Sequence, residues 1–139
     1  MRAGLLLASM FAFMAGGAAA EDLATKMIMA LEVNPGAVAF WAAGNDPPEN
    51  ETPVGAEVRW EAALKGAQAM QVKGRLLQSQ GLAREGPWST FAEMMITVAQ
   101  EGETAAKAKD AERAFEIGGR LYDACNGCHK TYVPRTPPP

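Results

Sequence analysis

The stretch that decides the fold is AERAFEIGGRLYDACNGCHKTY, residues 111–132. Asp110 precedes it and is a plausible N-cap, so the chain is expected to begin a helix here and to end it before Pro134. Residues at steps of three and four predict one buried stripe along this helix, namely Ala111, Phe115, Gly118, Tyr122, Cys125, His129 and Tyr132. Gly118 and Gly119 are poor helix formers, and we expect them to allow a neighbouring helix to approach closely or to be tolerated weak points.

Near the end of this helix lies Cys125-Asn126-Gly127-Cys128-His129. Positions i, i+3 and i+4 share one face of a helix, so both thiols and the imidazole are grouped. The two thiols of such a motif add across the two vinyl groups of one porphyrin, and the adjacent imidazole binds the iron as the proximal ligand. The motif therefore predicts one covalent haem c held by Cys125, Cys128 and His129. His129 is the only histidine of the chain, so no second imidazole is available.

Three other uses of these cysteines are weaker. A redox dithiol would be expected in a βαβ context, and the sequence contains no convincing strand. A structural zinc site usually takes four Cys or His ligands, whereas this chain has three. A plain disulfide would leave the adjacent histidine without a role.

Three further helices are expected, over residues 21–33, 54–79 and 90–107. Asn34-Pro35-Gly36 should break or kink the first, before a short apolar segment over residues 37–43. Residues 44–53 contain three prolines and form a loop. Thr90 and Glu93 have the spacing of a capping box. Four amphipathic helices predict an all-α fold, an antiparallel four-helix bundle with the haem in its core near one end.

Both ends of the chain have their own signals. Residues 1–20 combine Arg2, an apolar run and Ala18-Ala19-Ala20, which predicts a cleaved secretory signal peptide. The alternative, an uncleaved anchor, would need a longer apolar stretch, and no later segment looks apolar enough to cross a membrane. Residues 21–133 are expected to form one domain, and residues 134–139 a proline-rich disordered tail. Localisation in the periplasm follows.

Composition limits the class of protein. The 139 residues are 48% hydrophobic and 21% charged, the range of an ordinary globular domain, with a formal net charge of −3. No cluster of Lys and Arg suggests binding to nucleic acid. The three tryptophans, Trp41, Trp60 and Trp88, should pack the core or wall the cofactor pocket.

The chain resembles the class II c-type cytochromes, the family of cytochrome c′ and its low-spin relatives. The resemblance rests on Cys125-Asn126-Gly127-Cys128-His129 close to the C-terminus, on the run from Gly118 to Ala124 before it, and on Tyr132 after it. Met29, Pro35 and Trp41 also have the spacing of a subgroup of this family. Family members are often dimers through their first two helices, so a homodimer is an expectation, although the loop at 44–53 departs from the usual outline.

The resemblance also implies a sixth iron ligand in low-spin members, a methionine of the first helix. Met27 falls on the apolar stripe with Leu23 and Leu31 and would otherwise be core. Met29 falls on a mostly polar face, which is unusual unless haem covers it, and it is the favoured distal ligand, with Met27 as the alternative. Lys26 and Arg120 are candidates for contacts with the haem propionates.

The predicted function is one-electron transfer between periplasmic partner proteins. The alternative is a five-coordinate protein of the cytochrome c′ type that binds NO or CO. An enzyme such as a peroxidase would be expected to have a distal acid or base, and the chain has no second histidine, so we expect no enzymatic activity.

Overall fold

The computed structural model describes residues 21–133, and all of its regular elements are helices. The expected signal peptide and C-terminal tail lie outside these residues. A helix already present at Glu21 continues through the π-helical turn η1 (Met29–Val33) into α2 (Asn34–Gly44). The other helices are α3 (Pro53–Leu77), α4 (Trp88–Ala108) and α5 (Ala111–Tyr132). The prediction of an all-α fold with four helices is therefore confirmed for the described part of the chain.

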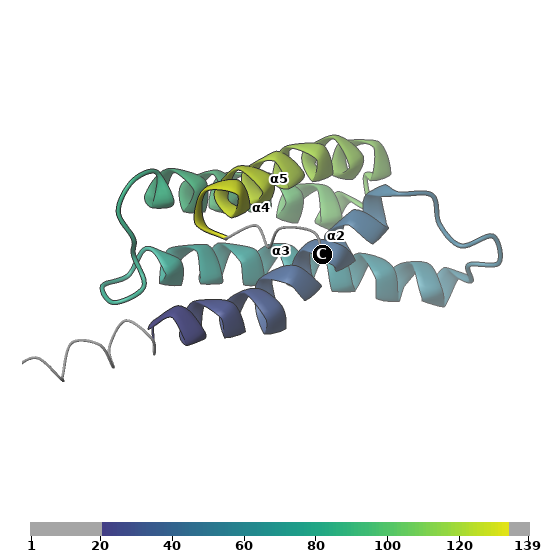
Figure 1. Cartoon of the computed structure of the whole chain (residues 1–139). Helices are drawn as coiled ribbons and strands as arrows, with labels where there is room; N and C mark the ends of the chain where they lie inside the picture. The colour runs from purple at the N-terminus through teal and green to yellow at the C-terminus, as the bar shows by residue number, and fades with distance from the viewer. Residues whose placement is uncertain (1–20, 134–139) are drawn as a thin grey trace, which may run out of the picture.

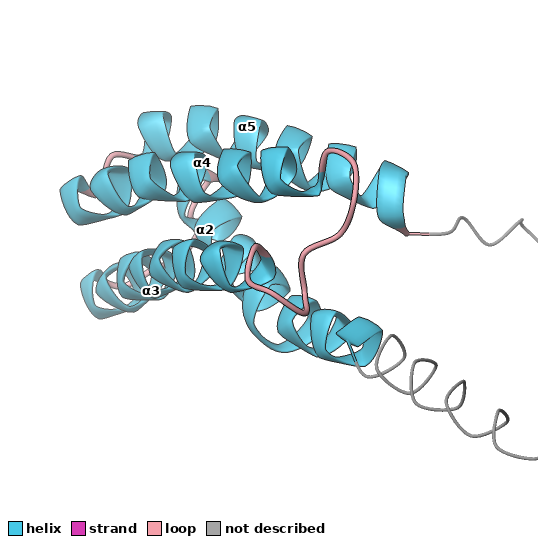
Figure 2. Ribbon diagram, turned by 90° about the vertical axis from the view of Figure 1, so that its left-hand side faces the viewer, coloured by secondary structure: helices cyan, strands magenta, loops and turns pink. Residues whose placement is uncertain are grey.

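The helices pack as two layers (Figures 1 and 2). The N-terminal helix lies beside α3, and α4 lies beside α5 in the second layer, while α2 rises to meet α5. Successive helices run in opposite directions and are joined at alternate ends, as in an up-and-down helical bundle. Side chains from both layers form one core, whose largest fully buried members are Phe40, Met70, Ile117 and Leu121.

Asn34-Pro35-Gly36 was predicted to break or kink the first helix, and the second outcome is the one observed: the helix continues and changes direction (Figure 1). Pro35 has no N–H to donate and its ring crowds the preceding turn. A π turn allows the helix to continue past Pro35, because the Asn34 N–H donates to the Met29 carbonyl, five residues back. Pro35 is the second residue of α2, directly after this π turn.

The prediction that the stripe of Leu23, Met27 and Leu31 is buried was wrong. Their exposed fractions are 59%, 51% and 65%, whereas Thr25 and Val33 on the other side of the helix are 7% and 4% exposed. Both sets of residues have helical spacing, so periodicity alone does not choose between them. The packing of the helix against α3 determines which of the two sets is buried.

Since Pro35 does not interrupt it, the N-terminal helix is longer and more apolar than expected. Within the described residues it is one helix, Glu21–Gly44, with the length and mean hydropathy (1.2) of a membrane-spanning helix. The prediction that no later segment is apolar enough therefore needs correction. The same composition also suits a core helix, and Val33, Ala37, Phe40 and Ala43 on its inner side are buried.

The remaining helix boundaries agree with the expected ones within two residues, but the caps do not all agree. The Asp110 carboxylate accepts a hydrogen bond from the Arg113 N–H at 3.0 Å, so the predicted N-cap of α5 is confirmed. The predicted capping box at Thr90 was wrong, because α4 begins at Trp88 after Pro87. A cap that was not predicted begins α3, where the Thr52 hydroxyl accepts from the Gly55 N–H at 3.0 Å.

The two helices of the first layer touch backbone to backbone where Gly36 meets Gly66. A Cβ atom built on Gly36 would lie 2.9 Å from the Gly66 carbonyl oxygen, and one on Gly66 would collide with the Gly36 carbonyl. The obstacle in both cases is backbone, which cannot rotate away as a side chain can. This crossing fixes the side of the N-terminal helix that faces inward.

We expect Gly36→Ala to lower the free energy of unfolding by about 1–3 kcal/mol, because the methyl group forces the two backbones apart. Urea unfolding followed by circular dichroism measures the change. Gly119→Ala is the matched control, since a Cβ there meets no atom within 4 Å. It should raise the stability by about 0.5–1 kcal/mol through helix propensity alone. Equal effects of the two substitutions would contradict the crossing.

Candidate functional site

The Cys-x-x-Cys-His motif lies in the last turns of α5, at the edge of the buried face of that helix. Cys125 and Cys128 are half-buried free thiols, and His129 is more exposed. The buried residues of α5 are Ala114, Ile117, Gly118, Leu121 and Ala124. The predicted stripe was therefore partly wrong: Phe115 and Tyr122 are 65% and 58% exposed, since that row lies at the margin of the core.

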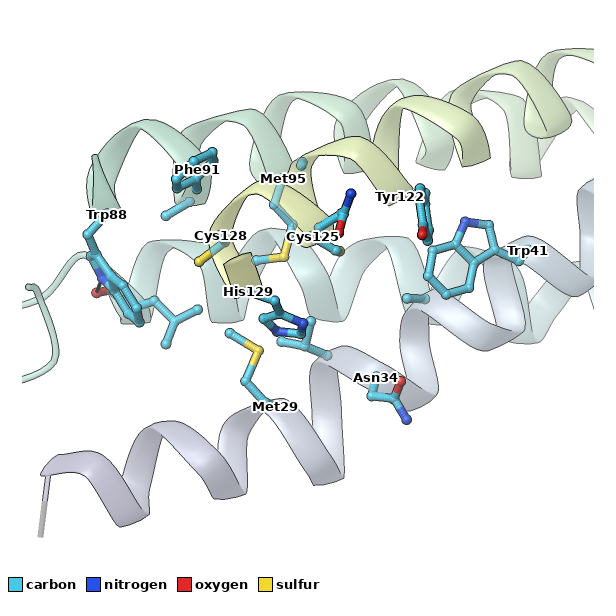
Figure 3. A pocket seen from close by; sticks show the side chains of 16 residues that line it. Met29, Asn34, Trp41, Trp88, Phe91, Met95, Tyr122, Cys125, Cys128 and His129 are labelled. Atoms are coloured by element: carbon cyan, nitrogen blue, oxygen red, sulfur yellow. Dashed lines mark hydrogen bonds between the residues drawn. The ribbon is translucent and has the colours of Figure 1, made fainter. Parts of the chain in front are cut away.

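Beside this edge is a cavity of about 290 Å³ between α5, α4 and the N-terminal helix (Figure 3). Cys125, Cys128 and His129 line it from α5, and Met29 lines it from η1. Apolar and aromatic side chains complete most of the wall, including Val33, Ala37, Trp41, Leu77, Trp88, Phe91 and Met95. The volume is near the lower end of the usual range for small-molecule sites.

Met29 and His129 both line this cavity (Figure 3). They are a hundred residues apart in the sequence and come from the two layers of the fold. Met27 does not line the cavity, and its side chain is half exposed on the outer side of the helix. The structure therefore places Met29, and not Met27, beside the histidine.

The two cations expected near haem propionates do not line the cavity either. Lys26 pairs with Asp22 at 2.6 Å, and 72% of its side chain is exposed. Arg120 forms two hydrogen bonds to the Glu101 carboxylate, at 2.7 and 2.8 Å. Both terminal nitrogens of the guanidinium group thus bond to α4, and the structure gives no support to a propionate contact by Arg120.

Burial controls the ionisation of the two thiols. It raises the pKa of Cys125 above its ordinary value, and the neighbouring Cys128 adds to this effect. Burial also raises the pKa of Cys128, while the positive charge of Arg84 opposes the rise. Both groups are therefore neutral thiols near neutral pH, the form that resists uncontrolled oxidation.

Trp41 and Trp88 line the two ends of the cavity (Figure 3), as expected for tryptophans in the wall of a pocket. The Trp41 indole N–H donates to the Gly118 carbonyl at 2.9 Å, and a Cβ on Gly118 would lie 2.9 Å from the Trp41 ring. Gly118 thus permits the close approach that the sequence suggested, whereas Gly119 faces open space. Trp60, the third tryptophan, is buried in the core.

Trp88 contacts both the C-terminal end of α5 and the residues around the loop between α3 and α4. Its indole N–H donates to the Leu77 carbonyl at 2.7 Å, and its ring meets Tyr132 edge-on at 5.0 Å between centroids. The Tyr132 hydroxyl donates to the Glu85 carbonyl at 2.6 Å. Arg84 of the same loop packs its guanidinium over the Trp88 ring. Sequence reasoning missed Arg84, because nothing in its local sequence marks it.

The donor set fits a haem better than a bare metal ion. The described residues contain no group of three His, Cys, Asp or Glu side chains placed to hold a metal. They do contain two thiols one helical turn apart, an imidazole beside them and a thioether from another helix, all lining one mostly apolar cavity. These are the kinds of group that could hold a haem.

Comparisons of the chain with protein-family models, with curated proteins and with solved structures find no match. The functional interpretation consequently depends on the motif and on the geometry of the cavity.

Proposed function

We propose that this protein is a periplasmic monohaem c-type cytochrome that transfers single electrons, with the helical-bundle architecture of class II. The observation that carries the proposal is that Met29 lines the same largely apolar cavity as His129 and both motif cysteines. A redox dithiol or a structural disulfide would require neither the cavity nor the methionine.

Each residue then has a defined role. Cys125 and Cys128 would hold the porphyrin through thioether bonds, and His129 and Met29 would be the iron ligands. When bound, haem supplies a one-electron redox couple, and a Met/His ligand pair raises its potential. Most of the cavity wall is apolar or aromatic, which suits a carrier whose cofactor gains and loses one electron.

The alternative function, binding of NO or CO by five-coordinate iron, depends on the same methionine. It requires that the thioether leave the distal position empty or yield it to the gas. The inward position of Met29, on a helix fixed by its crossing with α3, favours the six-coordinate carrier.

The partners and location follow from the chemistry. Attachment of haem outside the cytoplasm agrees with the expected signal peptide, and the electron donor and acceptor would then be other periplasmic proteins. No element of the proposal requires a nucleic acid, or membrane insertion of the mature chain.

The first test is the cofactor itself. Protein expressed with its leader in a host that matures c-type cytochromes should carry one haem that denaturing electrophoresis does not remove, and the intact mass should show it. Replacing both Cys125 and Cys128 by Ala should abolish covalent attachment. Absence of covalent haem in the unmodified chain would overturn the proposal.

The second test concerns the distal ligand. Met29→Ala should convert a low-spin spectrum to a high-spin one and allow CO to bind the ferrous form, because it removes the thioether. Met27→Ala is the matched control, two residues away on the exposed side, and should leave the spectrum unchanged. A high-spin, CO-reactive spectrum before any substitution would favour the gas-binding alternative. A change with Met27→Ala alone would reverse the ligand assignment.

We also propose that the protein forms a homodimer through its first layer. Large apolar side chains are exposed on the outer side of that layer, on the N-terminal helix (Leu23, Met27, Leu31 and Val38) and on α3 (Val54, Val58, Val72 and Leu76). Pairing these faces would leave the cavity accessible, since Met29 and Val33 lie on the inner side of the same helix.

Leu31→Glu should shift the protein toward the monomer, because it places a charge in the middle of this face. Light scattering coupled to size-exclusion chromatography measures the mass. Phe115→Glu is the control, because Phe115 is also 65% exposed but lies on α5. A monomeric unmodified protein, or dissociation by Phe115→Glu alone, would refute this interface.

A further inference from the structure

The interior of the cavity carries no fixed charge. None of its sixteen lining residues is Asp, Glu, Lys or Arg. The energy of a charged centre in this site must therefore depend on charges just outside the wall, which act through the protein with little intervening water.

One such charge touches the wall directly. The guanidinium carbon of Arg84 lies 4.9 Å from the centroid of the Trp88 ring, and Trp88 lines the cavity and is only 3% exposed. About a third of the Arg84 side chain is exposed, so its charge is only partly screened by solvent.

Asp22 holds Arg84 in place from the start of the N-terminal helix. Its carboxylate contacts the Arg84 guanidinium at 3.1 Å and the Lys26 ammonium at 2.6 Å, and these two cations lower the pKa of Asp22. This cluster of two cations and one carboxylate carries one net positive charge, on a protein whose formal net charge is −3. Lys26, a candidate for contact with the propionates, thus shares Asp22 with Arg84.

We propose that Arg84 is a positioning residue for the redox centre, which raises its reduction potential through Trp88, and that Asp22 offsets part of this effect. The inference rests on the proposed function. In the redox step the oxidised centre gains one electron from an external donor and no proton. The centre is then less positive, so a nearby cation favours the reduced form and a nearby carboxylate favours the oxidised form.

The test is a potentiometric titration of the covalently loaded protein with dye mediators. Arg84→Gln should lower the equilibrium constant for reduction about tenfold, which is about 59 mV for one electron. Arg84→Lys keeps the charge and should restore most of the potential. Asp22→Asn should shift the potential upward, and this opposite sign keeps the test decisive if Arg84→Gln fails to load haem.

Two controls separate electrostatics from structure. Arg113→Gln also removes a cation from an exposed ion pair, with Glu101, but Arg113 does not line or cover the cavity, so the potential should not change. The shift caused by Arg84→Gln should shrink as salt is raised from about 0.01 M to 1 M, since the screening length falls from about 30 to 3 Å.

An equal shift for Arg84→Gln and Arg113→Gln, a shift independent of salt, or no recovery with Arg84→Lys would overturn the role of Arg84. Each of these results is obtained on protein that carries covalent haem, so it leaves the proposed function intact. Failure of the unmodified chain to bind haem would instead overturn the proposed function, and this inference with it.

Discussion

The contact between Gly36 and Gly66 is the constraint on which the candidate site depends. Two helix backbones meet there without side chains between them, and this close approach fixes the rotation of the N-terminal helix about its axis. Residues 25, 29, 33 and 36 lie at helical spacing, so they turn inward together. Met29 thereby reaches the cavity, and Met27 is left on the outside.

Pro35 and the π turn before it have a related effect. In an uninterrupted α-helix, Pro35 would leave a carbonyl of the preceding turn without its N–H donor, and its ring would crowd that turn. A full break would instead separate Met29 from the core residues that follow. The π turn absorbs the mismatch within η1, the element that begins with Met29. π turns inside helices frequently occur at functional sites, and this one orients the proposed distal ligand.

The cavity exists because α5 presents its motif at the margin of its buried face. A motif in the centre of that face would be packed against α4 and leave no room for a cofactor, whereas one on the outer face would leave the cofactor in water. At the margin, the thiols are half buried and the indole rings of Trp41 and Trp88 close the two ends. The lining contains no Asp, Glu, Lys or Arg side chain, and the Arg84 guanidinium packs over the ring of Trp88.

The sequence by itself determined the all-helical class, the extent of α5 and its cap at Asp110, and the grouping of Cys125, Cys128 and His129. These features are local, since each depends on residues within a few turns of one helix. Only the tertiary structure decided which side of the N-terminal helix is buried and that the helix continues through Pro35. It also decided that Met29 lines the same cavity as His129, and that Arg84 contacts Trp88. Two faces of one helix can show the same periodicity, so the packing between helices determines which face is buried. A contact made by a side chain of a distant loop leaves no signal in the local sequence pattern, so it too depends on the packing.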